Sequence, residues 1–191
     1  MSTPRPPQPA KLVVGFLLND KKRLPVLAAE LEKRFGPVTL VSPWMPFSYT
    51  AYYETEMGAP LFRRVLAFRD LMAQDGLARI KRATNAIEQA HMVEGQRCVN
   101  IDPGYLLLAR FVLATGKNFS HRIYIGEGIY AELTLIFERG AFRPLPWTYP
   151  DYADRPLRDF LQRVRSQYAG DLNTLVNANP PASRGGRMAE P

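Results

Sequence analysis

The sequence predicts a single domain of the α/β class, with an α+β arrangement as the alternative, in which helices pack on a mixed β-sheet. Three observations carry this prediction. The chain has 191 residues, a length that suits one domain better than two. Apolar residues make up 46% of it, enough for a sizeable core. Short apolar runs alternate along the chain with amphipathic segments, as strands alternate with helices.

The first elements predict a β-α-β start. Residues 11–18 form an apolar run typical of a buried strand. Asp20 can cap a following helix, in which leucines recur at helical spacing. Gly36-Pro37 ends that helix, and residues 38–41 form the second strand.

The middle of the chain predicts one long helical region and one shorter helix. Residues 42–53 are aromatic and interrupted by proline, which favours irregular structure. An apolar stripe over residues 60–91 predicts helix. Residues 97–101 predict a third strand. Asp102-Pro103 has the form of a helix cap and first turn, so we expect a helix over residues 102–114.

The last third of the chain predicts a β-hairpin and a closing helix. The strands are expected at residues 119–125 and 129–137, around the turn Gly126-Glu127-Gly128. Residues 143–152 are aromatic and rich in proline. Residues 155–168 carry an apolar stripe at helical spacing and predict the last helix.

The register of this hairpin separates its side chains into two faces. A three-residue loop places Arg122 opposite Glu132 and Tyr124 opposite Tyr130, whereas a two-residue loop would mix the faces. His121 then falls on the aliphatic face, where a core histidine is expected. The polar face is either a solvated surface with a cross-strand ion pair or the floor of a binding site.

The two ends of the chain differ in composition from the rest. Residues 1–10 predict a disordered leader, residues 11–172 the globular domain, and residues 173–191 a disordered tail. No signal peptide or transmembrane segment is expected. The single cysteine, Cys98, excludes an intrachain disulfide and fits a cytoplasmic location.

The charge of the chain favours no particular partner. The formal net charge is +7, and the one tight basic cluster is Lys21-Lys22-Arg23. A mildly basic solvated surface explains this balance more simply than a nucleic-acid interface does, although nucleic acid is not excluded.

Common catalytic and nucleotide-binding motifs are missing. The chain has no G-x-x-x-x-G-K-[ST], no G-x-G-x-x-G and no G-x-S-x-G. Its two histidines, His91 and His121, are far apart in sequence, and nothing indicates a Ser-His-Asp triad.

Two polar residues lie where the predicted elements end. Asp102 follows a predicted strand, where a carboxylate can hold Mg²⁺ or act as a base, but it can equally cap the next helix. Lys117 follows a helix stop and can contact a phosphate or stabilise a helix C-terminus.

Two pairs of polar residues are candidate ligands. Glu54 and Glu56 lie two apart in a probable loop, where they can bind a hard cation such as Mg²⁺ or simply be exposed acids. Asn85 and Glu88 share one face of a predicted helix, either as ligands or as polar residues on its exterior.

An aromatic cluster precedes the last helix. Trp147 and Tyr149 accompany Asp151 in a segment that either lines a pocket or covers the edge of the sheet.

Several stretches together resemble a known family. They are YYETEMG (52–58), IKRATNAIE (80–88), VNIDPGYL (99–106), LATGKNFSHRIYIGEGIYAELTL (113–135) and WTYPDY (147–152). On these the chain resembles a bacterial and archaeal family described as domain of unknown function 4416, over nearly all of residues 11–170. The resemblance implies no established activity. Its motifs point to a polar set larger than a core needs: Glu54, Glu56, Asn85, Glu88, Asn100, Asp102, Lys117, His121, Arg122, Glu132, Thr134 and Asp151.

Two functions remain open on the sequence. The first is a site for a phosphate-bearing or nucleotide-like small molecule, with Mg²⁺ and turnover both undecided. Its expected catalytic residues are Asp102, Glu132 and His121, its expected ligand contacts are Lys117, Arg122, Tyr124, Asn85, Trp147, Tyr149 and Asp151, and its expected metal ligands are Glu54 and Glu56. The alternative is a module that binds RNA or a protein without turnover. The sequence does not predict an oligomeric state.

Overall fold

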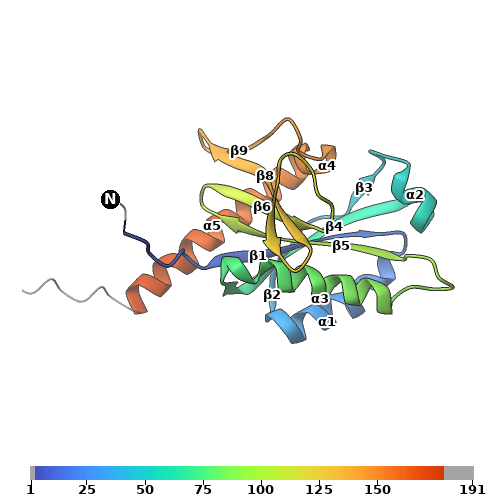
Figure 1. Ribbon diagram of the computed structural model, residues 1–191, viewed down its shortest axis with the longest axis horizontal. Helices are drawn as coiled ribbons and strands as arrows, with labels where there is room; N and C mark the ends of the chain where they lie inside the picture. The colour runs from blue at the N-terminus through green and yellow to red at the C-terminus, as the bar shows by residue number, and fades with distance from the viewer. Residues whose placement is uncertain (1–2, 179–191) are drawn as a thin grey trace, which may run out of the picture.

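One nine-stranded β-sheet runs through the molecule, with helices on both of its faces (Figure 1). The structure is a computed structural model and describes residues 3–178. The strand order is β2-β4-β1-β5-β6-β8-β7, with β3 paired to β4 and β9 paired to β8. The predicted class is confirmed. Every ladder is antiparallel, so the sheet is not the mixed sheet that was expected, and it has the α+β character that was the alternative.

The predicted β-α-β start is present, with one strand inserted into it. β1 (Ala10–Leu18) is buried at every residue because it pairs with β4 on one side and β5 on the other. The 3₁₀-helix η1 (Lys21–Arg23) and α1 (Leu24–Phe35) follow, and Gly36 ends α1. β2 (Val38–Val41) and β1 both run antiparallel to β4, so they are parallel to each other with β4 between them.

The predicted helical region over residues 60–91 is wrong in its first half. Its first part is β4 (Leu61–Met72), followed by the 3₁₀-helix η2 (Gln74–Gly76), and only α3 (Leu77–Ala90) is helical. In β4, Leu61, Arg63 and Val65 alternate inward with period two. An arginine at a buried position concealed that alternation and left a spacing that resembles a helix.

The predicted helix over residues 102–114 is also wrong. β5 (Val99–Leu107) continues through Asp102-Pro103 and turns directly into β6 (Arg110–Thr115). Gly104 explains how closely these strands pack, because a Cβ there would lie 2.4 Å from the carbonyl oxygen of Val112. Asp102 is therefore a residue inside a strand and not a helix cap.

The hairpin register is confirmed. β7 (Arg122–Gly126) pairs with β8 (Ile129–Glu138), which places Arg122 opposite Glu132 and Tyr124 opposite Tyr130. The predicted three-residue loop is wrong, because Ile129 pairs with Gly126 and not with Ile125. The register shifts between Tyr124 and Gly126, so a bulge and not a longer loop keeps the two faces separate. β7 begins at Arg122, and His121 is therefore not on the strand's aliphatic face.

The segments around the hairpin complete the chain. β3 (Met45–Phe47) and α2 (Tyr52–Met57) lie in the region predicted to be irregular. β9 (Ala141–Pro144) and α4 (Pro150–Ala153) follow the hairpin.

The ends differ from the predicted boundaries. Ala10 already belongs to β1, and residues 3–9 have no regular secondary structure. α5 (Arg155–Ala178) extends past the predicted helix end at residue 168, and residues 173–178 of the expected tail are helical. The rest of that tail, 179–191, lies outside the described residues, as do residues 1–2.

Two cores cover the two faces of the sheet. α1 and α3 pack Leu27, Leu31 and Ile87 against one face. α5 packs Phe160 and Val164 against the other. Over the described part of the chain, no helix combines the length and the apolar composition needed to cross a membrane.

Candidate functional site

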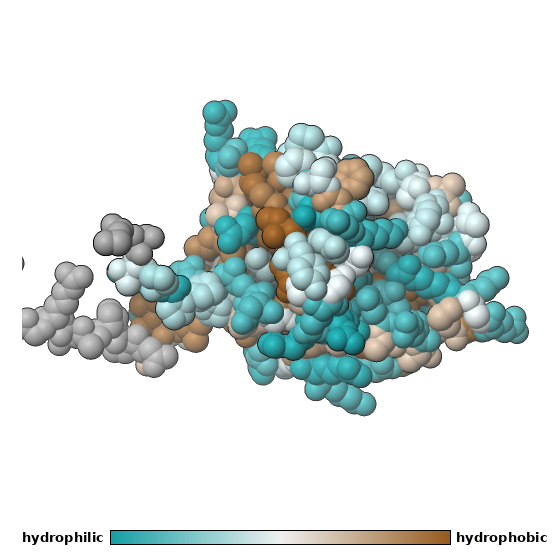
Figure 2. Space-filling view, viewed as in Figure 1, coloured by the Kyte–Doolittle hydropathy of each residue, from teal (hydrophilic) through white to brown (hydrophobic). Residues whose placement is uncertain are grey.

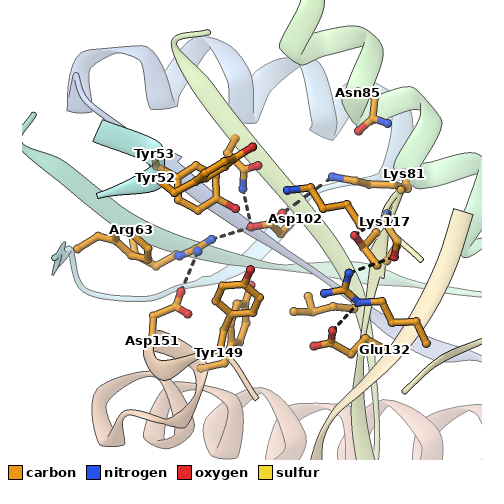
Figure 3. A pocket seen from close by; sticks show the side chains of 18 of the residues that line it. Tyr52, Tyr53, Arg63, Lys81, Asn85, Asp102, Lys117, Glu132, Tyr149 and Asp151 are labelled. Carbon is orange, nitrogen blue, oxygen red and sulfur yellow. Dashed lines mark hydrogen bonds and ion pairs between the residues drawn. The ribbon is translucent and has the colours of Figure 1, made fainter. Parts of the chain in front are cut away.

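A cavity opens where β5 and β6 stop pairing. The two strands are hydrogen-bonded only from Gly104–Leu107 to Arg110–Leu113, whereas β5 pairs with β1 from end to end. A cavity of about 390 Å³ lies beside the unpaired half of β5 (Figure 3). Small-ligand sites span roughly 300–1,000 Å³, so its volume suits such a ligand. Its lining comes from β3 to β8, from α2, α3 and α4, and from the loops between them. It includes Tyr52, Tyr53, Arg63, Lys81, Asn85, Arg97, Asn100, Asp102, Lys117, Arg122, Glu132, Tyr149, Asp151 and Tyr152.

Asp102 lies at the centre of this cavity. Its Oδ2 accepts hydrogen bonds from Arg63 Nη1 at 2.9 Å and from Asn100 Nδ2 at 2.6 Å. Burial opposes ionisation of Asp102, but the positive charges of Arg63 and Lys81 outweigh it and lower the pKa of the carboxyl. Asp102 is therefore ionised at neutral pH.

Arg63 joins two carboxylates from distant parts of the chain. It is 4% exposed, and its Nη2 lies 2.7 Å from Asp151 Oδ2 on α4 while Nη1 binds Asp102. Burial lowers the pKa of Arg63, but the charges of Asp151 and Asp102 outweigh it and raise the pKa overall. Burial raises the pKa of Asp151 above its usual range, and Arg63 only partly offsets that effect. The two carboxyls on one guanidinium thus have pKa values moved in opposite directions.

The close approach at Arg63 depends on a glycine in the neighbouring strand. Gly15 of β1 lies opposite Asp102 in the sheet. A Cβ at Gly15 would lie 2.6 Å from the Tyr152 hydroxyl and 3.3 Å from Arg63 Nη1. Only glycine leaves room for both groups above β1.

Lys81 carries an ammonium that is only partly paired. Its side chain is buried, and Nζ donates to the carbonyl oxygen of Ile101 at 2.7 Å. The nearest carboxylate oxygens, on Glu88 and Asp102, lie 3.8 and 3.9 Å away, beyond hydrogen-bond distance. An ammonium has three N–H donors, so Lys81 retains donors for a ligand in the cavity.

Glu132 anchors the opposite wall. It is 4% exposed, and its Oε2 accepts from Arg122 Nε at 2.9 Å and lies 3.1 Å from His121 Nε2. His121 in turn stacks on Trp147, with ring centroids 5.0 Å apart and an interplanar angle of 10°. The expectation of a core histidine on the aliphatic face is therefore wrong, because the chain turns before β7 and directs His121 to Glu132.

Exposed rings and one exposed lysine surround the opening. Lys117 Nζ lies 4.8 Å from the centroid of the Tyr52 ring. Within residues 3–178, Lys117 has no carboxylate partner within 4.0 Å. Tyr149 is 47% exposed and Tyr52 54%, which leaves ring surface free for a ligand.

The structure brings many of the predicted site residues together. Those that line the cavity are Asn85, Asp102, Lys117, Arg122, Glu132, Tyr149 and Asp151. His121 and Trp147 do not line it but support Glu132 from behind. Tyr124 is 59% exposed, packs on Tyr130 and lies outside the cavity lining.

The predicted metal pair is not assembled. Glu54 and Glu56 lie on α2 rather than in a loop, and residues two apart on a helix point in different directions. Glu54 is exposed, and Glu56 Oε2 lies 3.3 Å from Arg97 Nη1. The part of the chain that the structure describes contains no group of three or more His, Cys, Asp and Glu side chains placed to hold a metal ion.

Several lining residues escaped the sequence analysis. Arg63 was hidden by the misassigned β4, although the alternation of Leu61, Arg63 and Val65 is the signal that reveals it. Lys81 was not singled out because polar residues on α3 were expected on its exterior, whereas Lys81 is buried and lines the cavity. Glu88, which was a candidate, is buried as well but does not line this cavity. Tyr152 belongs to the aromatic stretch WTYPDY, which was expected either to line a pocket or to cover the sheet edge, and it lines the cavity.

The lining carries more positive than negative charge. Its cations are Arg63, Lys81, Arg97, Lys117 and Arg122, and its carboxylates are Asp102, Glu132 and Asp151. Figure 3 shows Lys81 and Lys117 on one side of Asp102, and Arg63 with Asp151 on the other. Such an arrangement can neutralise an anion at the lysine side while the carboxylates accept hydrogen bonds from the rest of the ligand.

Comparison with known proteins places the chain in one family. Neither the curated proteins nor the solved structures give a match. A family model does match, over residues 8–168, and it covers every residue that lines the cavity. The chain belongs to the family described as Domain of unknown function (DUF4416).

Proposed function

We propose that the cavity beside β5 binds a small phosphate-bearing ligand of nucleotide-like size. The observation that carries this proposal is that two lysines on the same cavity of about 390 Å³ have, within the described part of the chain, no carboxylate oxygen at hydrogen-bond distance, whereas the arginines of the lining are paired. A cation with donors left over favours an anionic partner.

Lys81 and Lys117 are the groups best placed to take the phosphate. Lys81 has no carboxylate oxygen closer than 3.8 Å, and among the described residues Lys117 has none within 4.0 Å. Arg122 adds a third positive charge to the lining, although its Nε already donates a hydrogen bond to Glu132. Charge-assisted hydrogen bonds from such groups to phosphate oxygens are about twice as strong as neutral ones.

The tyrosines at the opening supply the second part of the proposal. The Tyr52 and Tyr149 rings are each about half exposed and border the cavity. Base or sugar rings pack on such faces, and stacking contributes about 1–3 kcal/mol per base. The proposed ligand therefore combines a phosphate with a ring.

Any turnover at this site needs a proton acceptor or donor. Asp102, one of the expected catalytic residues, has a lowered pKa and is a weak base, which suits it to positioning. Asp151, whose pKa burial raises, is better matched to proton transfer. The proposal is therefore one of binding, with Asp151 as the group to test if an activity is found.

A thermal-shift screen tests the proposal. The panel holds inorganic phosphate, sugar phosphates, nucleotides and a short RNA, each with and without Mg²⁺, in a buffer free of phosphate. A ligand at about 100 times its Kd stabilises the folded protein by roughly 2.7 kcal/mol. We expect at least one phosphate ester to raise the melting temperature of the wild type.

Lys81→Met should abolish that shift, because it removes the partly paired ammonium and keeps the length of the side chain. Arg82→Met is the matched control, since Arg82 is the next residue on α3, its side chain is 64% exposed and it pairs outside the cavity with Glu127. An equal shift in the wild type and in Lys81→Met would contradict the proposed site.

The RNA in the panel tests the second candidate function. A surface away from the cavity combines cations with rings: Lys21 Nζ lies 3.8 Å from the Phe62 centroid, and the Arg64 guanidinium lies 4.9 Å from the Trp44 centroid. Single-stranded nucleic acid favours such surfaces, and its binding weakens strongly with salt. If only the RNA raises the melting temperature, and the rise weakens with salt, the result would favour RNA binding at this surface over ligand binding in the cavity. A cytoplasmic location is part of both candidates.

A further inference from the structure

The Arg63 end of the cavity contains buried polar atoms without hydrogen-bond partners. They include the hydroxyl of Tyr152 and Oδ1 of Asp151, on residues that are 3% and 5% exposed. Both residues line the cavity. An unsatisfied buried polar group typically costs about 1–3 kcal/mol, so adjacent ones call for a partner that is not part of the chain.

We propose that this end binds a hydroxyl-bearing part of the ligand, which makes the ligand a sugar phosphate or a ribose-containing nucleotide. The inference rests on the proposed function, because it concerns the far end of the same ligand. Asp151 Oδ1 accepts a hydrogen bond from one ligand hydroxyl, and the Tyr152 hydroxyl bonds to the same or a neighbouring one.

The local charge excludes a second phosphate at this end. Both Nη atoms of Arg63 contact carboxylate oxygens, of Asp102 and Asp151, within 2.9 Å. At Lys81, by contrast, the nearest carboxylate oxygens lie 3.8 and 3.9 Å from Nζ, so its donors stay available to a phosphate. A further anion there would be repelled by carboxylates that already surround the guanidinium. An apolar group would leave both polar atoms unpaired, whereas a neutral hydroxyl satisfies them.

The two ends are close enough for one ligand. Asp102 lies between them, since Oδ2 binds Arg63 and Oδ1 lies 3.9 Å from Lys81 Nζ (Figure 3). Oδ1 has no closer ion-pair partner in the described residues, so it can accept from a hydroxyl in the middle of the ligand. A phosphate at Lys81 and hydroxyls at Asp102 and Asp151 thus lie in the same order along the cavity as these groups lie along a sugar phosphate.

Tyr152→Phe tests this inference with little risk to the fold. The substitution removes only the hydroxyl, which has no partner in the protein, and keeps the ring that stacks on Phe111 at 5.8 Å. We expect the unliganded variant to melt at the same temperature as the wild type or higher. Affinity for ribose 5-phosphate should fall about tenfold, while affinity for inorganic phosphate stays unchanged.

Two comparisons complete the experiment, each read by calorimetric titration. Pentyl phosphate has the same number of carbons as ribose 5-phosphate but no other hydroxyls, and it should bind the wild type more weakly. Tyr130→Phe is the control variant, because Tyr130 packs on Tyr124 outside the cavity lining, and it should bind both esters as the wild type does.

The outcomes separate this inference from the proposed function. Equal affinity for both esters, or an equal loss for ester and inorganic phosphate in Tyr152→Phe, would overturn the hydroxyl end and leave the phosphate site standing. Binding of free ribose without any binding of phosphate would overturn the proposed function and support the hydroxyl end. No binding of ribose, phosphate or ester would overturn both.

Discussion

At the scale of single residues, Arg63 organises the site. It is buried in β4 and pairs with Asp102 of β5 and Asp151 of α4, residues that are far apart in the chain. Removing one partner of a buried ion pair leaves the other charge uncompensated, which typically destabilises a protein by about 3–5 kcal/mol. The cluster therefore links the stability of the fold to the shape of the cavity.

The Asp102 carboxylate should give the protein a pH-dependent stability. Its pKa is lowered in the folded state, so its ionised form stabilises the fold above the unfolded pKa of about 3.9. That contribution is lost as the pH falls from there through the lowered pKa. Asp102→Asn should lose about 3 kcal/mol of unfolding free energy at pH 7, and the difference from wild type should shrink below about pH 4.

Urea unfolding at several pH values measures this difference. Asp159→Asn is the control, because Asp159 is 68% exposed and, among residues 3–178, pairs only with Arg155 on the same helix. Such surface pairs contribute less than about 1 kcal/mol. A difference for Asp102→Asn that is the same at pH 7 and pH 3.5 would show that its charge is not the cause.

At the scale of elements, the sequence predicted those whose patterns are local. β1, α1, β2, the β7–β8 hairpin and the start of α5 appear where expected, because apolar runs, caps and turn glycines mark them. β4 was missed, and of the β5–β6 hairpin only the start of β5 was predicted, at residues 97–101. Arg63 breaks the apolar alternation of β4, and its burial is explained only by carboxylates from β5 and α4. Asp102-Pro103 has the pattern of a helix start, and only its pairing with β1 shows that the two residues lie inside a strand.

The C-terminal part of α5 offers a prediction at this scale. Lys11 is fully buried in β1, and its Nζ lies 2.6 Å from Asp171 Oδ2 on α5. Residues beyond Leu172 are exposed, and Figure 2 shows apolar surface on this end of the helix, where Leu175 and Val176 lie. The last residues of α5 expected to matter for stability are thus Asp171 and the partly buried Leu172.

Asp171→Ala should therefore lower the free energy of unfolding by about 1–3 kcal/mol. This loss is smaller than for a fully buried ion pair, because the side chain of Asp171 is 31% exposed. Removing residues 173–191 should change it by less than about 1 kcal/mol. Denaturant unfolding of both variants beside the wild type measures the two effects. A larger loss on truncation than on Asp171→Ala would refute this account of α5.

At the scale of the whole molecule, the cavity is a consequence of how the sheet divides. β5 pairs with β1 along its full length but with β6 at one end only, so the β6–β8–β7 part separates from the central strands. α3 and α4 then place side chains at the opening from two sides. The polar residues in the stretches that resemble the family could be predicted from the sequence as a set. That they meet in one cavity could not be predicted, because it depends on this separation of the strands.

The most direct test of the central claim is a crystal structure of the protein with ribose 5-phosphate. We expect the phosphate within hydrogen-bond distance of Lys81 Nζ, with Lys117 or Arg122 as a second contact. The sugar hydroxyls should lie near Asp102 and Asp151. An ester bound instead at Lys21 and Arg64, or a cavity that stays free of ester at saturating concentration, would contradict the claim.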